Sequence, residues 1–168
     1  AYLKVGGFKD MFGEDIDLST RIRKAGFSVE LFPDAYVYHK RRVSLKSFYK
    51  QVYVFGMARV DLYLMHPESL KLVHLLPAVF VLGVLFLLIS SFICPWALLP
   101  LGIYILALFL ESLWVNKSLS IALLSIVTSF IQLGGYGNGF IYAFVRKVIL
   151  KQKVDVEAEL KKHYKKKA

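Results

Sequence analysis

The chain has 168 residues, of which 57% are hydrophobic, and its formal net charge is +10. This length allows one modest domain, or a small soluble piece joined to a membrane segment. The charges are segregated: between residues 75 and 144 the charged side chains are Glu111 and Lys117, whereas residues 146–168 are rich in lysine. An apolar block with basic flanks is typical of an integral membrane protein and argues against an ordinary soluble domain. The one cysteine, Cys94, excludes a disulfide framework and a cysteine-rich metal site.

Residues 1–43 are expected to form a compact α/β piece. Three short segments are predicted to be strands: residues 2–5, 28–32 and 35–38. A helix is predicted at residues 15–25, because acidic side chains gather at its start and basic ones at its end, and Gly26 follows as a C-terminal stop. The piece is too small to bury a core alone, so we expect it to pack against something outside this sequence.

Residues 44–73 are predicted to contain an amphipathic helix with basic side chains. Its apolar and aromatic positions recur at helical spacing: Leu45, Phe48, Tyr49, Val52, Phe55 and Gly56. Two interpretations remain open. The helix lies at a membrane interface, or it is an ordinary surface helix packed on the soluble piece.

Residues 74–145 are predicted to form transmembrane helices, about three in number. Residues 75–94 and 96–115 are apolar runs long enough to cross a hydrocarbon core of ~30 Å. The third run begins at residue 119 and meets a glycine cluster at residues 134–139, which predicts either a break or a point of close packing. Glu111 is costly inside a membrane, so it either lines the helix bundle or makes a structural hydrogen bond.

The orientation of these helices poses a conflict. Basic residues precede and follow the apolar block, and both sets favour the cytoplasmic side. Three full spans would place them on opposite sides, so either the third segment is re-entrant or interfacial, or the tail breaks this tendency. We expect the N-terminal part to be cytoplasmic and leave the side of the tail, residues 146–168, open. The tail is expected to lie on anionic lipid or to be solvated.

Two short motifs near the start carry the functional signal. Gly6-Gly7-Phe8 is followed by Gly13-Glu14-Asp15-Ile16-Asp17-Leu18, and then by Val37-Tyr38-His39. This arrangement resembles the second half of the catalytic domain of family 2 glycosyltransferases, which has a Gly-Gly-Phe turn before a Glu-Asp-x-Asp-Leu helix start. The resemblance covers about residues 2–59 and continues more loosely through the apolar segments. It implies a C-terminal fragment of an α/β GT-A fold.

The resemblance also implies an activity. A sugar would pass, with inversion, from a nucleotide-sugar donor to a lipid-linked or glycan acceptor at the cytoplasmic face of a bacterial plasma membrane. Membrane lipids are further expected partners, and nucleic acid is not. The donor-binding half, with the family's Asp-x-Asp metal motif, would precede Ala1. We therefore expect this chain to be inactive in isolation.

Carboxylates at the helix start are the candidate catalytic groups. The resemblance implies that Asp15 is the base that takes the proton of the acceptor hydroxyl, and that Glu14 contacts the acceptor. The alternative is that Asp15 caps the helix and Glu14 only favours its dipole. Gly6 and Gly7 would let the backbone approach the sugar, with Phe8 beside them. Asp17 is expected to pack or to pair near Arg21, because side chains at i and i+2 of a helix do not face each other.

His39 is the candidate metal ligand. In some metal-dependent relatives a histidine at the matching place completes the Mg²⁺ or Mn²⁺ site, although one histidine is not a metal site and an ordinary packed or exposed side chain is the alternative. Arg41 and Arg42 would neutralise a diphosphate leaving group.

Gln51 is the last substrate-binding candidate. It falls where processive relatives carry a Gln-x-x-Arg-Trp motif, but the Arg-Trp pair is missing here. This departure argues against a processive polysaccharide synthase and favours transfer of one or a few sugars. Two alternatives stay open: a polyprenyl phosphate acceptor, as in enzymes like dolichyl-phosphate-mannose synthase, or a non-catalytic membrane anchor, assembly or lipid-handling protein with a degenerate transferase remnant.

Overall fold

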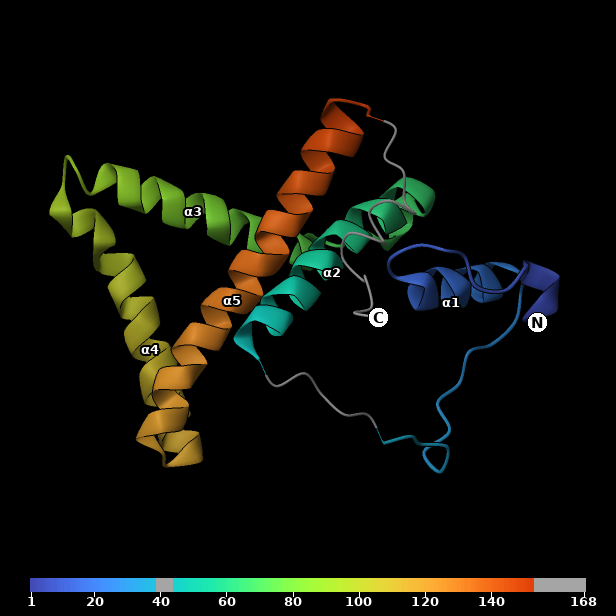
Figure 1. Ribbon diagram of the computed structural model, residues 1–168, viewed down its shortest axis with the longest axis horizontal. Coiled ribbons are helices and arrows are strands. Elements are labelled where there is room, and N and C mark those ends of the chain that lie inside the picture. The colour runs from blue at the N-terminus through green and yellow to red at the C-terminus, as the bar shows by residue number, and fades with distance from the viewer. Residues whose placement is uncertain (39–43, 153–168) are drawn as a thin grey trace, which may run out of the picture.

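Figure 1 shows the computed structural model, which describes residues 1–38 and 44–152. Within these ranges the regular elements are helical. The longer helices are α1 (Glu14–Lys24), α2 (Leu45–Met65), α3 (Leu76–Ser90), α4 (Leu99–Asn116) and α5 (Leu119–Phe144). Short turns of 3₁₀-helix lie before and between them: η1 (Leu3–Val5), η2 (Pro67–Ser69), η3 (Leu72–His74) and η4 (Pro95–Leu98). A π-helical turn, η5 (Val145–Ile149), continues α5.

The expected α/β architecture is wrong, because the described residues contain no β-strand. The first predicted strand is the 3₁₀ turn η1, and residues 28–38 follow an irregular, largely exposed path broken by a turn in which Ala35 N–H donates to the Phe32 carbonyl. A strand is stable only when a neighbouring strand takes up its backbone hydrogen bonds. The described part of the chain offers no such neighbour, so alternation in the sequence does not produce a sheet here.

The helix predicted at residues 15–25 is confirmed as α1, displaced by one residue. Glu14, Asp15 and Asp17 lie in its first turn, and Arg21, Arg23 and Lys24 lie in its last turn. Both groups have the sign that the helix dipole stabilises. Gly26 follows with a φ of +84°, a left-handed conformation that glycine adopts without steric cost.

α2 is the central helix of the molecule and packs across α5 (Figure 1). It buries side chains on more than one side: Val52, Val54, Met57, Ala58, Val60 and Leu62. α2 is buried on more than one side because α5 covers one side and the start of α1 covers another. α2 therefore links the N-terminal part to the apolar helices.

Glycines make the crossing of α2 and α5 close. A Cβ atom at Gly56 would lie 2.1 Å from the Tyr136 carbonyl oxygen, and one at Gly139 would lie 2.0 Å from the Tyr53 carbonyl oxygen. On another side of α5, a Cβ at Gly137 would lie 2.3 Å from the carbonyl oxygen of Pro77 in α3. The glycine cluster is thus a point of close packing inside one continuous helix.

Two of the helices are long and apolar enough to cross a membrane: Pro95–Asn116 and Leu119–Ile149. α3 is also apolar but has 15 residues, which gives a length of about 22 Å, less than a hydrocarbon core. It ends at Ser90, and the hydroxyl of the following Ser91 donates to the Leu88 carbonyl. The helix is therefore shorter than the 20-residue span that the sequence predicted at residues 75–94.

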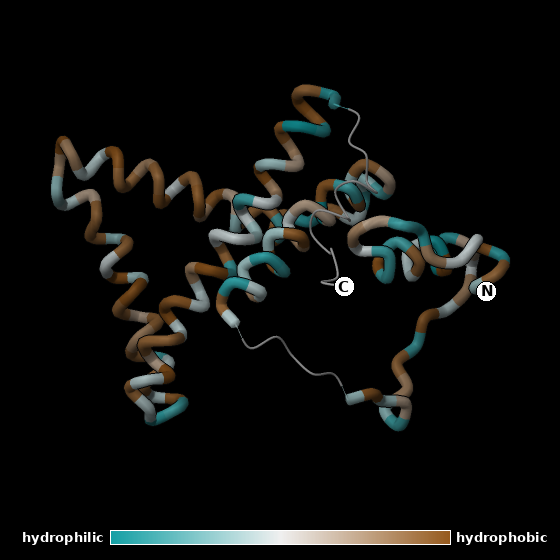
Figure 2. The backbone as a smooth tube through the Cα atoms, in the orientation of Figure 1, coloured by the Kyte–Doolittle hydropathy of each residue, from teal (hydrophilic) through white to brown (hydrophobic). Residues whose placement is uncertain are grey.

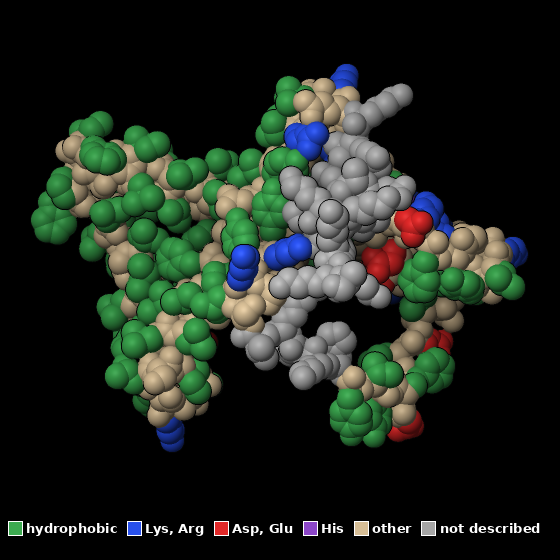
Figure 3. Space-filling model, viewed as in Figure 1, with side chains coloured by type: hydrophobic (Ala, Val, Ile, Leu, Met, Phe, Trp, Pro, Cys, Tyr) green, Lys and Arg blue, Asp and Glu red, His purple; other side chains and the backbone are tan. Residues whose placement is uncertain are grey.

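The apolar helices do not form a parallel bundle. α3 and α4 both contact α5 and diverge from it, so that the three helices outline a triangle (Figure 1). Hydrophobic residues dominate α3, α4 and α5, whereas α1 and its loops contain both hydrophobic and hydrophilic residues (Figure 2). In the space-filling view, hydrophobic side chains cover α3 and α4, and acidic side chains gather around the N-terminal part (Figure 3).

Candidate functional site

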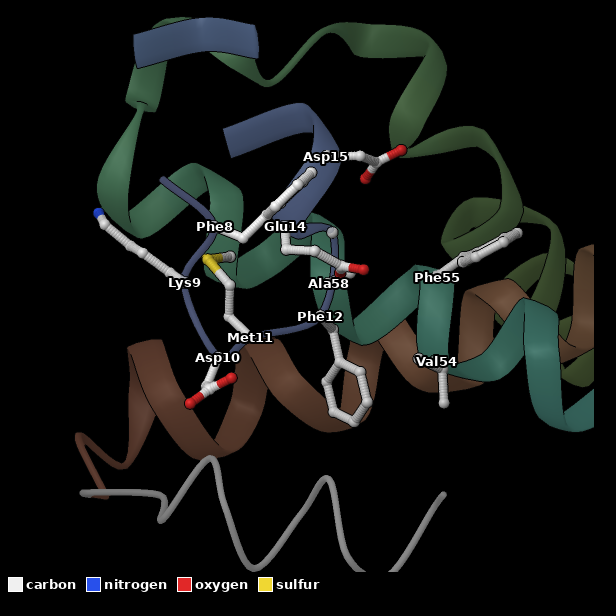
Figure 4. Close-up of a pocket in the computed structure, with 11 residues that line it drawn as sticks. Phe8, Lys9, Asp10, Met11, Phe12, Glu14, Asp15, Val54, Phe55 and Ala58 are labelled. Carbon is white, nitrogen blue, oxygen red and sulfur yellow. The ribbon is translucent and has the colours of Figure 1, made fainter. Parts of the chain in front are cut away.

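A cavity of about 740 Å³ lies between the start of α1 and the middle of α2 (Figure 4). The loop before α1 contributes most of its lining, and α2 contributes an apolar wall. The lining residues are Phe8, Lys9, Asp10, Met11, Phe12, Gly13, Glu14, Asp15, Val54, Phe55 and Ala58. Carboxylates and aromatic rings therefore share one concave surface, which is the usual composition of a site for a polar ligand with apolar faces.

Gly13 determines how α1 begins. Its φ is +77°, and its carbonyl accepts hydrogen bonds from the N–H groups of Ile16 and Asp17. A Cβ atom at this position would lie 3.3 Å from the Cδ1 of Leu62 and would be strained by the positive φ. Glycine thus lets α1 start in direct contact with α2.

The side chains of Glu14 and Asp15 are exposed on the cavity wall. The N-cap of α1 is Gly13, and no side chain caps the helix, so Asp15 does not act as the cap. Within the described part of the chain, neither carboxylate has an ion-pair partner. Figure 4 shows both extending toward the side of the cavity where Phe55 lies. Both groups are therefore available to a ligand.

Asp17 has a different role from its neighbours in the motif. It is fully buried, and its carboxylate accepts a hydrogen bond from Arg21 Nε at 2.8 Å and pairs with Arg21 Nη2 at 2.7 Å. The other carboxylate oxygen lies 2.9 Å from His66 Nε2. The expected pairing of Asp17 near Arg21 is confirmed. The last acidic residue of the motif is therefore a structural anchor.

Arg21 extends this anchor to the glycine loop. Its Nη2 donates to the Gly7 carbonyl at 2.6 Å, and its Nη1 donates to the Val5 carbonyl. Both oxygens belong to the turn around Gly6 and Gly7, where φ is +81° and +67°. One guanidinium therefore fixes the turn against α1, on the loop that leads to Phe8.

His66 connects the network to the end of α2. Its Nδ1 lies 3.0 Å from Lys24 Nζ, and Lys24 pairs with Glu68 at 2.6 Å. His66 was not among the candidates from the sequence. A histidine just before a proline, at the end of an apolar helix, gives no local signal that it will meet an aspartate 49 residues earlier.

The network alters the ionisation of Asp17. Burial would raise the pKa of this carboxyl group, but hydrogen bonds to Arg21 and His66 and the positive charges of Lys9 and Arg21 hold the pKa below its usual value. Asp17 is therefore held as a carboxylate in the folded chain.

Of the remaining candidate residues from the sequence that the structure describes, Phe8 lies at the cavity and the others lie outside its lining. Phe8 lines the cavity and meets Tyr2 edge to face, with ring centroids 5.8 Å apart. Gly6 and Gly7 form the preceding turn, and Gln51 lies in α2 about one turn before Val54, outside the set of lining residues. His39, Arg41 and Arg42 lie outside the described residues.

The described residues do not supply a metal centre. Among residues 1–38 and 44–152, no three histidine, cysteine or acidic side chains come together as a ligand set. The lining of the described site presents carboxylates and aromatic rings.

Comparison with known proteins connects this site to a family. The family model described as "Glycosyl transferase family group 2" matches residues 1–111, which is more than half of the chain. The match includes the glycine turn, α1, the cavity and the whole of α2 and α3. Neither a curated protein nor a solved structure matches the chain.

Proposed function

This chain belongs to the glycosyl transferase family group 2, and on that premise we propose that its cavity is the acceptor site of an inverting sugar transferase. The donor is a nucleotide sugar, and the acceptor is a lipid-linked sugar or glycan. The observation that carries the proposal is that Glu14 and Asp15, both free of ion pairs within the described residues, line one cavity with Phe8 and Phe55.

The cavity suits a sugar in size and in chemistry. A volume of about 740 Å³ lies within the range of small-molecule sites. Carboxylates accept hydrogen bonds from sugar hydroxyls, and the aromatic rings of Phe8 and Phe55 offer apolar surface to the C–H faces of a sugar ring.

Asp15 is the proposed base. In inverting transfer the acceptor oxygen attacks the anomeric carbon, the bond from that carbon to the nucleotide diphosphate breaks, and the hydroxyl proton passes to the carboxylate. The carboxylate must come within hydrogen-bond distance of the hydroxyl, about 2.6–3.2 Å. Glu14, on the same wall, accepts a hydrogen bond from another acceptor hydroxyl and orients it.

The position of the cavity favours a membrane-bound acceptor. α2 forms its apolar wall and also packs on α5, which is long and apolar enough to cross a membrane. An acceptor anchored in lipid would therefore find the site beside the membrane segment. The proposed location is the cytoplasmic face of a bacterial plasma membrane.

The other expected contacts remain predictions. A Mg²⁺ or Mn²⁺ ion with His39 as a ligand, a diphosphate bound by Arg41 and Arg42, and an acceptor contact from Gln51 are all implied by the family resemblance.

The test is a transfer assay on the complete enzyme in membranes. Asp15→Asn keeps the shape of the side chain but removes the base, so we expect kcat to fall about 10²–10⁴-fold with little change in acceptor binding. Glu14→Gln is expected to raise the KM for the acceptor more than it lowers kcat.

Asp34→Asn is the matched control, because Asp34 is an exposed carboxylate in a turn and does not line the cavity. It should leave kcat within about threefold of the wild type. If Asp15→Asn transfers sugar at the wild-type rate, Asp15 is not the base. If the complete protein transfers no sugar at all while it is folded in the membrane, the non-catalytic alternative replaces the proposal.

A further inference from the structure

A second, smaller cavity lies between α4 and α5, away from the site described above. It has a volume of about 270 Å³ and is lined mainly by polar side chains. The lining residues are Leu108, Glu111, Ser112, Val115, Asn116, Ser125, Thr128, Ser129 and Gln132. We refer to this surface as the polar groove. It lies on the two helices that are long and apolar enough to cross a membrane.

Some polar side chains of the polar groove form hydrogen bonds within the chain. The hydroxyls of Ser112 and Ser125 lie 2.8 Å apart and join the two helices, and Asn116 Nδ2 donates to the Ser112 carbonyl at 3.0 Å. The Thr128 hydroxyl donates to the Leu124 carbonyl at 3.0 Å. These bonds fix the geometry of the groove.

Glu111 and Gln132 are the exceptions. Both are exposed, and within the described part of the chain neither side chain makes a hydrogen bond or an ion pair. An ionisable side chain on a membrane-crossing helix is costly when it faces lipid, and such side chains are normally covered by protein or water. The polar groove therefore needs an occupant.

The side chains that line the polar groove indicate which kind of molecule it can bind. Its described lining contains no aromatic ring for a sugar and no cation for a phosphate, and the Glu111 carboxylate repels an anion. Hydroxyls and carboxamides, however, both donate and accept hydrogen bonds, and the Glu111 carboxylate accepts them. Such a surface is complementary to itself.

In a two-fold symmetric contact, one surface patch of a chain packs against the same patch of the second chain, at the same depth in the membrane. Such a patch must therefore be complementary to itself. Hydrogen bonds between polar side chains also promote helix association in lipid. The main contacts of α4 among the described elements are with α5 and η4, so the groove side of α4 is open to a second chain. We propose that the polar groove is the contact between two copies of this chain in the membrane.

Cysteine cross-linking tests this contact in the intact protein in lipid vesicles. In a Cys94→Ser background, Val115→Cys places a thiol in the groove while Glu111 stays in place, and Val115 is 67% exposed. Leu110→Cys is the matched control, because Leu110 is 53% exposed on α4 but lines a different cavity with Trp114 and Lys117. We expect Val115→Cys to form disulfide-linked dimers at least fivefold faster than Leu110→Cys. Equal rates, or no cross-link from either, would overturn the proposal.

A second measurement uses protein that carries no engineered thiol. The dimer fraction is measured by energy transfer between labelled chains as the lipid-to-protein ratio is raised. Glu111→Leu is expected to lower the association constant at least tenfold, whereas Glu111→Gln, which keeps an acceptor oxygen for hydrogen bonds, should retain most of it. A wild-type chain that stays monomeric at every ratio contradicts the proposal. So does a chain that carries a bound lipid, detected by native mass spectrometry, which Glu111→Leu removes without changing the oligomeric state.

Discussion

The Asp17 carboxylate and the His66 imidazole lie 2.9 Å apart, although 49 residues separate them in the chain. Both residues are buried, and their contact joins α1 to the end of α2. Arg21 adds the glycine turn to the same network. The wall that presents Glu14 and Asp15 is therefore held in place by a polar contact as well as by apolar packing.

Replacing Asp17 should destabilise the N-terminal part. Asp17→Asn removes the charge that balances Arg21, whose side chain is largely buried, and weakens the bond to His66. Losing one partner of a buried ion pair costs about 3–5 kcal/mol, and the amide that remains recovers part of it, so we expect a loss of about 2–3 kcal/mol. The measurement is urea unfolding of the protein in detergent micelles. Asp34→Asn, at an exposed carboxylate in a turn, should change stability by less than about 0.5 kcal/mol.

Acid should remove the contribution of Asp17. Its pKa is lower in the folded chain than the ordinary value of 3.8, so below about pH 5 the unfolded chain binds more protons than the folded one. The contribution is therefore complete above the unfolded pKa and is lost as the pH falls through the folded pKa. The stability difference between wild type and Asp17→Asn should shrink between pH 5 and pH 3. A difference that stays constant over this range would contradict the assignment.

His74 should give a separate pH dependence nearer neutrality. Burial lowers its pKa from 6.5, and the charges of Arg59 and Lys71 lower it further. The Lys71 backbone N–H also donates to His74 Nδ1 at 3.0 Å, which requires that nitrogen to be unprotonated. Since the folded pKa is depressed, stability present above about pH 6.5 is lost on acidification. Unfolding measured from pH 7.5 to 5.5 should show a smaller loss for His74→Gln than for wild type, and equal losses would exclude this role.

The crossing of α2 and α5 should not tolerate a methyl group. Gly139→Ala would place Cβ 2.0 Å from the Tyr53 carbonyl oxygen, so the helices must separate. We expect a loss of at least about 2–3 kcal/mol, or failure to fold. Gly134→Ala is the control, because a Cβ there meets no atom within 4 Å, and it should be neutral or slightly stabilising. Thermal unfolding followed by circular dichroism compares the two, and similar midpoints would show that the crossing is loose.

A buried ion pair joins η5, which continues α5, to α2. Lys147 Nζ donates to Asp61 Oδ1 at 2.7 Å, and the side chains are 8% and 14% exposed. Lys147→Met leaves Asp61 without this partner and should cost about 2–4 kcal/mol. Asp61→Leu combined with Lys147→Met should recover much of the loss, because the carboxylate that Lys147 balances is removed together with Lys147. Additive losses in this double-mutant cycle would show that the two residues are not coupled.

Sequence alone predicted the features that depend on local pattern. The charge order of α1, the stop at Gly26, and the apolar character of the later helices all follow from residues near one another in the chain. The family was also predictable, because the glycine turn and the acidic motif that carry the resemblance are both short and contiguous.

The α/β prediction failed because alternation describes one strand, whereas a sheet needs a partner strand that the described residues do not provide. The glycine cluster allowed either a break or close packing, and only the position of Tyr53 and Pro77 opposite Gly139 and Gly137 decided between them. Nor could the sequence show that Asp17 is buried while Glu14 and Asp15 face a cavity.

Local charge and hydropathy thus determined which segments of this protein are helical and apolar, because those properties act within a few residues. Tertiary structure decided which carboxylate became an anchor and which remained open to a ligand. That choice depends on Arg21 reaching the glycine turn and on His66 returning from the end of α2. Burial and hydrogen bonding between distant segments exist only after the chain has folded, and so they leave no signature in the order of the residues.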